Sequence, residues 1–174
     1  KPTDLYVIDD MNPRLFSNNL LLPYIVAVWE EYCRSSFIVL LKYSPQRETA
    51  LKKVNLNQSQ LEAIASNMAT VEDSVANTFS FQRPSIIDKN FKLIDPGMNL
   101  AGVLRKPYRR RKISLFDTIE CCVEDRNEFV HSGLMNINLT DQKLQTILSD
   151  FEVAVERCYQ EFGRRFKFVP RHAY

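Results

Sequence analysis

The sequence contains few of the residues on which metal, cofactor and disulfide sites depend. Only two histidines are present, and the four cysteines, Cys33, Cys121, Cys122 and Cys158, include no C-x-x-C pair. A zinc site would therefore need an unusual set of ligands. No glycine-rich phosphate loop or other cofactor motif occurs either. The sequence predicts no metal ion, no cofactor and reduced thiols, because a chain of 174 residues does not need disulfides to fold.

Long apolar runs are also missing. The longest, residues 20–29, contains Pro23 and is about half the length of a membrane-spanning helix. The first residues, KPTDLYVIDDMNP, are polar and lack the apolar core of a signal peptide. The chain does not start with Met, as expected for a segment trimmed or cut from a larger parent protein. We expect a cytoplasmic protein without a membrane role; the net charge of +2 indicates no particular partner.

The sequence contains only 4 glycines beside 8 prolines, and no extended segment alternates apolar with polar residues as a half-buried strand does. Apolar residues recur at helical spacing instead, which predicts an all-α bundle of four long helices with additional short ones. The long helices are expected from Pro13 to about residue 42, over 58–79, from Ser114 towards His131, and from about residue 141 to Gly163. A single domain would span residues 1–174, with its core between 13 and 166.

Several residues mark the ends or the core of these helices. Asn12 and Pro13 look like an N-cap followed by a first-turn proline, while Pro23 should kink the first helix or mark its true start. Trp29 fits either the core or a dimer interface. Cys158 lies on the apolar stripe of the last helix, so it is interpreted as a core residue and not as a nucleophile.

The segment RNEFVHSG, residues 126–133, brings three groups suited to an anionic substrate to the end of the third predicted helix. Arg126 offers a cationic fork, Asn127 an amide and His131 a ring that changes its charge near neutral pH. Asn127 and His131 share a face of an ideal helix, whereas Arg126 and His131 diverge by about 140°. Gly133 follows as a C-terminal stop, so the imidazole is expected near solvent.

This motif resembles the mark of the HEPN family of ribonucleases and RNA-binding domains, which is Arg, often Asn, and then His after four intervening residues. The stretches SFQRPSIIDKNFKL and KPYRRRKISLFDTIECCVEDRNEFVHSGL look like a bacterial branch of that family. The resemblance is strong from about residue 79 to 134 and rests on helical pattern elsewhere between 15 and 166. It implies a HEPN-type bundle. Gly133 stands where some HEPN toxins carry a Tyr that a partner antitoxin modifies, so that mode of regulation is not expected.

The resemblance also implies a mechanism, in which His131 acts as general base on a ribose 2′-OH and then as general acid towards the leaving oxygen. Arg126 would hold the scissile phosphate, and Asn127 would orient His131 or add a neutral donor. Because the substrate supplies its own nucleophile, no metal is required and DNA should resist cleavage. In the family two motifs face each other across a homodimer. The expected activity is that of an endoribonuclease, as in a toxin with its antitoxin or a phage-defence effector.

Three other interpretations of the motif stay open. Arg126 could pair with Glu120 or Glu124 on the surface, with His131 complementing the helix dipole. A HEPN module could dimerise and bind RNA or a protein partner without cutting. A purely structural interaction domain is the third, and it predicts that neutralising residues 109–111 leaves RNA affinity unchanged.

A second signal is a basic segment immediately before the motif helix. Six basic residues surround one aromatic residue in Arg105, Lys106, Tyr108, Arg109, Arg110, Arg111 and Lys112. Such a segment is typical of an RNA-binding patch in which Tyr108 stacks on a base, but also of a solvated loop or a localisation signal. Lys112 and Arg126 are 14 positions apart, or about 21 Å along a helix, so the patch is expected to contact flanking RNA. The basic C-terminal segment around Arg164, Arg165 and Arg171 is assigned no role, and neither is His172.

Overall fold

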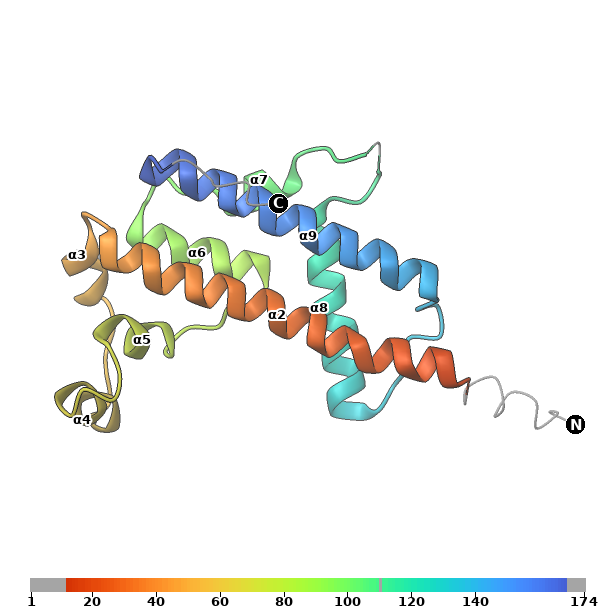
Figure 1. The fold of residues 1–174 in the computed structure, drawn as a ribbon, viewed down its shortest axis with the longest axis horizontal. Coiled ribbons are helices and arrows are strands. Elements are labelled where there is room, and N and C mark those ends of the chain that lie inside the picture. The colour runs from red at the N-terminus through yellow and green to blue at the C-terminus, as the bar shows by residue number, and fades with distance from the viewer. Residues whose placement is uncertain (1–11, 110, 169–174) are drawn as a thin grey trace, which may run out of the picture.

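Eight α-helices and no β-strand make up the part of the chain that the computed structural model describes, residues 12–109 and 111–168 (Figure 1). They are α2 (Pro13–Tyr43), α3 (Arg47–Leu51), α4 (Gln58–Ala65), α5 (Val71–Ala76), α6 (Pro84–Ile94), α7 (Leu100–Arg105), α8 (Leu115–Ser132) and α9 (Asp141–Phe166). The predicted all-α bundle is confirmed. Residues 1–11, 110 and 169–174, among them Arg110, Arg171 and His172, lie outside the described residues.

The ends of the long helices follow the local signals of the sequence. The Asn12 side chain accepts a hydrogen bond from the backbone N–H of Arg14, and Pro13 occupies the first turn of α2. Ser114 caps α8, and Gly133 ends it in the left-handed conformation with φ of 70°. Thr140 caps α9 in the same manner as Ser114. Pro23 lies inside α2 and is not its start.

The prediction of one helix over residues 58–79 is wrong, because the segment forms two short helices, α4 and α5. Asn67 between them has a φ of 57°, which interrupts the right-handed helix. Thr70 then starts α5 by forming a capping box with Asp73. The predicted stop at Gly163 is also wrong, since α9 continues to Phe166 and ends where Lys167 takes a φ of 57°.

The bundle is built around α2 and α9, which lie side by side and run in the same direction (Figure 1). Helix α8 crosses both at a steep angle, and α6 and α7 lie behind them. Trp29 of α2 packs edge-on against Phe151 of α9, with ring centroids 6.0 Å apart. Phe91 of α6 stacks on Phe162 at 5.0 Å. Trp29 is therefore a core residue, 1% exposed, and Cys158 is buried in the same core as predicted.

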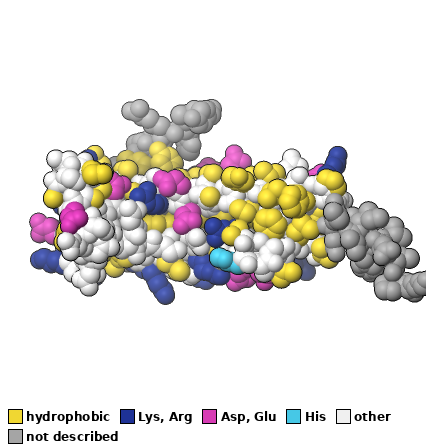
Figure 2. Space-filling model, turned by 90° about the horizontal axis from the view of Figure 1, so that it is seen from below, with side chains coloured by type: hydrophobic (Ala, Val, Ile, Leu, Met, Phe, Trp, Pro, Cys, Tyr) yellow, Lys and Arg dark blue, Asp and Glu magenta, His cyan; other side chains and the backbone are white. Residues whose placement is uncertain are grey.

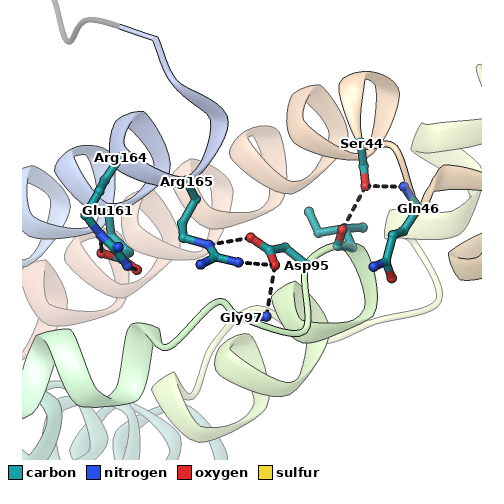
Figure 3. A network of polar contacts seen from close by, with 8 residues as sticks. Ser44, Gln46, Asp95, Gly97, Glu161, Arg164 and Arg165 are labelled. Carbon is teal, nitrogen blue, oxygen red and sulfur yellow. Dashed lines mark hydrogen bonds and ion pairs between the residues drawn. The ribbon is translucent and has the colours of Figure 1, made fainter.

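A polar network at the C-terminal end of α9 fixes that helix to the turn after α6 (Figure 3). The Arg165 guanidinium donates to Asp95, with 2.6 Å between Nε and Oδ2, and the Gly97 backbone N–H donates to the same carboxylate. Arg165 holds the pKa of Asp95 below its ordinary value, so this carboxylate stabilises the fold above about pH 4 and loses that contribution as the pH falls. Arg164 hydrogen-bonds to Glu161, one turn earlier in the same helix.

Candidate functional site

The motif lies on a half of α8 that projects beyond the core. Leu115, Ile119 and Val123 in the first half are buried, but no residue from 124 to 132 is. Below α2 in Figure 1, this second half leaves the body of the bundle. It is held by its connection to α9, where Asn136 donates to Asp125 at 2.6 Å and exchanges hydrogen bonds with Asn19 of α2. The motif therefore stands on a projecting helix end with few apolar contacts.

Arg126 and Asn127 form a hydrogen-bonded pair within the motif. The Arg126 guanidinium donates from Nη1 to Oδ1 of Asn127 at 2.8 Å, and both side chains are half-buried. Nε of Arg126 is buried and has no hydrogen-bond partner among the described residues. No hydrogen bond joins Asn127 to His131 there. Asn127 therefore positions Arg126, and the expectation that it orients His131 finds no contact in its favour.

Two carboxylates that precede the motif on α8 are bound to a different arginine. Arg83, at the start of α6, donates to Glu120 at 2.9 Å and to Glu124 at 3.2 Å. Both hydrogen bonds raise the pKa of Arg83, that to Glu124 contributing most. The alternative in which Arg126 pairs with Glu120 or Glu124 is wrong, and Arg126 forms no ion pair within residues 12–109 and 111–168. A guanidinium without a counter-ion is suited to bind an anion.

His131 lies exposed in the last turn of α8. No hydrogen bond connects it to the half-buried Arg126. This agrees with the two side chains pointing away from each other on the helix. One chain therefore presents Arg126 and His131 as two separate groups, in reach of solvent but not of each other's polar atoms.

After Arg105, the described residues of the basic segment, 106–109 and 111–112, form a loop. An arginine that the sequence did not single out fixes this loop to α9. Arg157 donates to the backbone carbonyls of Lys106 at 2.9 Å and Pro107 at 3.0 Å. The half-buried ring of Tyr108 lies 5.0 Å from the guanidinium of Arg109 and 5.5 Å from those of Arg111 and Arg157. Its hydroxyl oxygen is buried. Tyr108 is thus surrounded by guanidinium groups, which differs from the freely available stacking platform expected.

Two arginines of the basic segment, Arg105 at the end of α7 and Arg111 in the loop, have structural contacts. Arg105 stacks on the Phe116 ring at 3.8 Å, and Arg111 forms an ion pair with the buried Asp150 of α9. Burial raises the pKa of Asp150, and the nearby Arg111 opposes that shift. The side chains of Lys106, Arg109 and Lys112 are exposed, and among the described residues the one hydrogen bond of the Arg109 side chain goes to the Ser149 hydroxyl, at 3.3 Å. These three carry the cationic surface of the described part of the loop.

The loop and the motif lie at opposite ends of α8. In Figure 1 the loop rises above α9, whereas the end of α8 emerges on the far side, next to α2. The predicted separation of the basic patch from the motif is therefore maintained, and the loop does not fold back onto Arg126.

Exposed apolar residues surround the end of α8. On α2, Phe16, Leu20, Tyr24 and Val28 follow each other at intervals of four residues, and Tyr24 and Val28 are both 70% exposed. Val130, Leu134 and Ile137, at and just after the end of α8, are exposed as well. Figure 2 shows hydrophobic side chains gathered on this side of the molecule, next to the histidine. So many large apolar groups in one area are typical of a protein-binding surface.

The remaining thiols and acids do not form a second reactive centre. Burial raises the pKa of Cys122 and of Cys158 to about 12, which makes both poor nucleophiles at neutral pH. The described residues contain no cluster of three or more His, Cys, Asp or Glu side chains placed to hold a metal ion. Among the described helices, none is both long and apolar enough to cross a membrane.

No protein-family model matches this chain, and no curated protein and no solved structure matches it either. The HEPN resemblance therefore stays a prediction that rests on the motif and its surroundings.

Proposed function

We propose that this chain is a metal-independent endoribonuclease of the HEPN type that acts on single-stranded RNA as a homodimer. The observation that supports this most is the state of Arg126. Its guanidinium is half-buried, held by Asn127 and paired with no carboxylate in the described structure, while Arg83 binds Glu120 and Glu124 of the same helix. Such a group favours a phosphate, with which it forms two parallel hydrogen bonds.

The chemistry needs only the RNA and the motif. A His131 imidazole removes the proton of a ribose 2′-OH, and the resulting oxygen attacks the adjacent phosphorus. Arg126 neutralises charge that builds on the non-bridging oxygens. The bond from phosphorus to the 5′-oxygen breaks, and an imidazolium returns a proton to that oxygen. The products are a 2′,3′-cyclic phosphate and a 5′-hydroxyl, with no net gain or loss of protons.

A second copy of the chain would complete the site. Arg126 and His131 of one chain form no hydrogen bond with each other, and we expect a phosphate held by one Arg126 to meet the imidazole of the partner. The apolar face formed by Phe16, Leu20, Tyr24, Val28, Val130, Leu134 and Ile137 adjoins the motif and is where we place the interface. Joining two such faces would bury apolar side chains and the projecting ends of α8 together.

The placement of this interface is tested by charge. Replacing both Tyr24 and Val28 by Glu should convert a dimer into a monomer, because two pairs of carboxylates would be buried without partners. Sedimentation velocity measures the change, and Val39→Glu is the matched control, since Val39 is exposed further along α2. A double variant that sediments as wild type would contradict the placement.

The proposed activity is tested with labelled single-stranded RNA and DNA of one sequence, incubated with purified protein in EDTA. Cleavage of the RNA alone, leaving 2′,3′-cyclic phosphate ends, is the expected result. RNA that stays intact with dimeric protein would favour the alternative, a non-catalytic HEPN module. The large apolar face supports that alternative as well, because a binding module also needs a partner surface.

The basic loop is expected to bind RNA that flanks the cleavage position. Replacing Arg109 and Lys112 by Ala should weaken binding of single-stranded RNA. It should also make the slope of log K against log[salt] less steep by roughly 1.4, or about 0.7 for each lost phosphate contact. Fluorescence anisotropy at several salt concentrations measures both effects. Lys52→Ala with Lys53→Ala is the control, since these exposed lysines lie at the opposite end of the molecule. Unchanged affinity in the loop variant would favour a protein-interaction domain.

A further inference from the structure

A groove of about 440 Å³ lies between α8 and α9, beside the basic loop. Ile113 of the loop, Cys121 of α8 and Ile147 of α9 contribute apolar surface to its walls. On α8 it reaches Asp125, the residue before Arg126. Its volume falls in the range of small-molecule sites, about 300–1,000 Å³. The groove thus connects the loop at one end of α8 with the start of the motif.

Asp150 lines this groove with an acceptor that lacks a donor. The side chain is 1% exposed, and Arg111 bonds to Oδ2. The other oxygen, Oδ1, is buried without a hydrogen-bond partner in the described part of the chain. A buried carboxylate oxygen costs free energy until a donor reaches it. The groove therefore combines apolar walls with one site for an N–H group.

Three cationic side chains line the same groove. Arg111 and Lys112 line the groove from the loop, and Lys143 lines it from the first turn of α9. An alkyl chain or an apolar side chain would leave Oδ1 of Asp150 unsatisfied and would not use these charges. A flat aromatic ring that carries an amine and is attached to a phosphate would use the apolar walls, the free acceptor and the cationic side chains together.

We propose that the groove binds one amino-bearing nucleobase of single-stranded RNA, whose exocyclic amine donates to Oδ1 of Asp150 while its phosphates contact Lys143 and Lys112. This inference rests on the proposed function, since it takes RNA as the substrate, and it adds a base preference to it. Adenine, cytosine and guanine carry an exocyclic amine, whereas uracil does not. Because Arg111 already bonds to Oδ2 of Asp150, only Oδ1 is left to accept a hydrogen bond, which matches one exocyclic amine of one base.

The native chain carries a probe for this groove. Cys121 is exposed on its wall, whereas Cys33, Cys122 and Cys158 are buried. Iodoacetamide should label Cys121 first, slowly, because burial and the nearby Glu124 and Asp125 raise the pKa of its thiol. Oligo(A) and oligo(C) made with 2′-O-methyl riboses, which lack the attacking hydroxyl, should slow this labelling about 10-fold at ten times their dissociation constants. Oligo(U) of the same length should give much weaker protection.

A variant tests the same groove without the thiol. Thr146→Trp places a large ring in the groove from a half-buried position, and it should lower oligo(A) affinity to the value for oligo(U). Thr49→Trp is the matched control, because Thr49 is exposed on the distant α3. Melting curves show that both variants fold. Should Thr146→Trp unfold the chain, Cys121 protection in the wild-type protein still decides the question.

The outcomes separate this inference from the proposed function. Equal protection of Cys121 by oligo(A) and oligo(U), or none by either, would overturn the base site even if RNA is cleaved. Selective protection by oligo(A) and oligo(C) without any cleavage of unmodified RNA would support the base site and overturn the nuclease.

Discussion

Replacing His131 by Ala is expected to lower the rate of RNA cleavage by about 10²- to 10⁴-fold, the usual contribution of a general acid or base. The imidazole is exposed in the last turn of α8, so its removal should leave the fold and the melting temperature unchanged. RNA affinity should also persist, because the cations of the loop and Arg126 remain. Single-turnover cleavage of end-labelled RNA measures the rate, and fluorescence anisotropy measures the affinity.

Ser132→Ala is the control for this experiment. Ser132 neighbours His131 and is exposed, but its hydroxyl bonds back to the carbonyl of Glu128 in the same helix. Its loss should change the cleavage rate little. An His131→Ala protein that cleaves RNA as fast as wild type would show that the nuclease activity of the preparation has another source.

Mixing two inactive variants extends the prediction to the dimer. Arg126→Ala and His131→Ala each damage both sites of a homodimer. A heterodimer of the two contains one site with an intact Arg126 and an intact His131 from opposite chains. Mixed subunits should therefore recover part of the activity that neither variant shows alone, whereas sites built within one chain would recover none.

The largest expected loss of stability comes from Trp29→Ala. The Trp29 side chain is 1% exposed, packs on Phe151 and donates from Nε1 to the carbonyl of Gln82 at 3.2 Å. Truncation leaves a cavity at the contact between α2 and α9, and such changes cost about 3–5 kcal/mol. Since domains are stable by roughly 5–15 kcal/mol, a large part of the native stability would be lost. Urea unfolding followed by circular dichroism measures the change.

Two further variants separate the causes of this loss. Trp29→Phe retains a ring for Phe151 but removes the donor to Gln82, and it should cost about 1–2 kcal/mol. Tyr43→Ala, at the exposed end of the same helix, should have almost no effect. If Trp29→Ala unfolded at the same urea concentration as Tyr43→Ala, the packing of α2 on α9 described above would be contradicted.

The starts of α2, α8 and α9 and the end of α8 could be predicted from the sequence because their signals are local, whereas the end of α9 was misplaced at Gly163. Asn12 with Pro13, Ser114 and Thr140 cap helices through contacts within three residues, and Gly133 ends α8 through its own backbone conformation. The break between α4 and α5 was missed for a related reason. Apolar residues recur at helical spacing across the break, which favours one continuous helix. The capping box of Thr70 and Asp73 favours a new helix start, and the two local signals are of similar strength.

The candidate site could be predicted only in part, since its decisive contacts join distant segments. The motif and its place at the end of a helix follow from residues 114–133. Arg83 lies 37 residues from Glu120 in the chain, and Arg157 lies 50 residues from Pro107. Neither pairing leaves a signal in one sequence. The groove between α8 and α9 was missed because it depends on how two helices pack and on the buried position of Asp150.

Because the end of α8 projects from the core, the motif can lose its helical structure while the rest of the fold stays intact. Residues 124–132 have no buried side chain, so amide hydrogens there can exchange with solvent by local fraying while the core around Trp29 stays closed. Two links restrain this fraying, Asn19 with Asn136 and Asn136 with Asp125. A partner that covered the apolar face would slow exchange at Arg126 and His131 without raising the protection of the core. The motif of an isolated chain is thus the first part of α8 to lose its shape on warming.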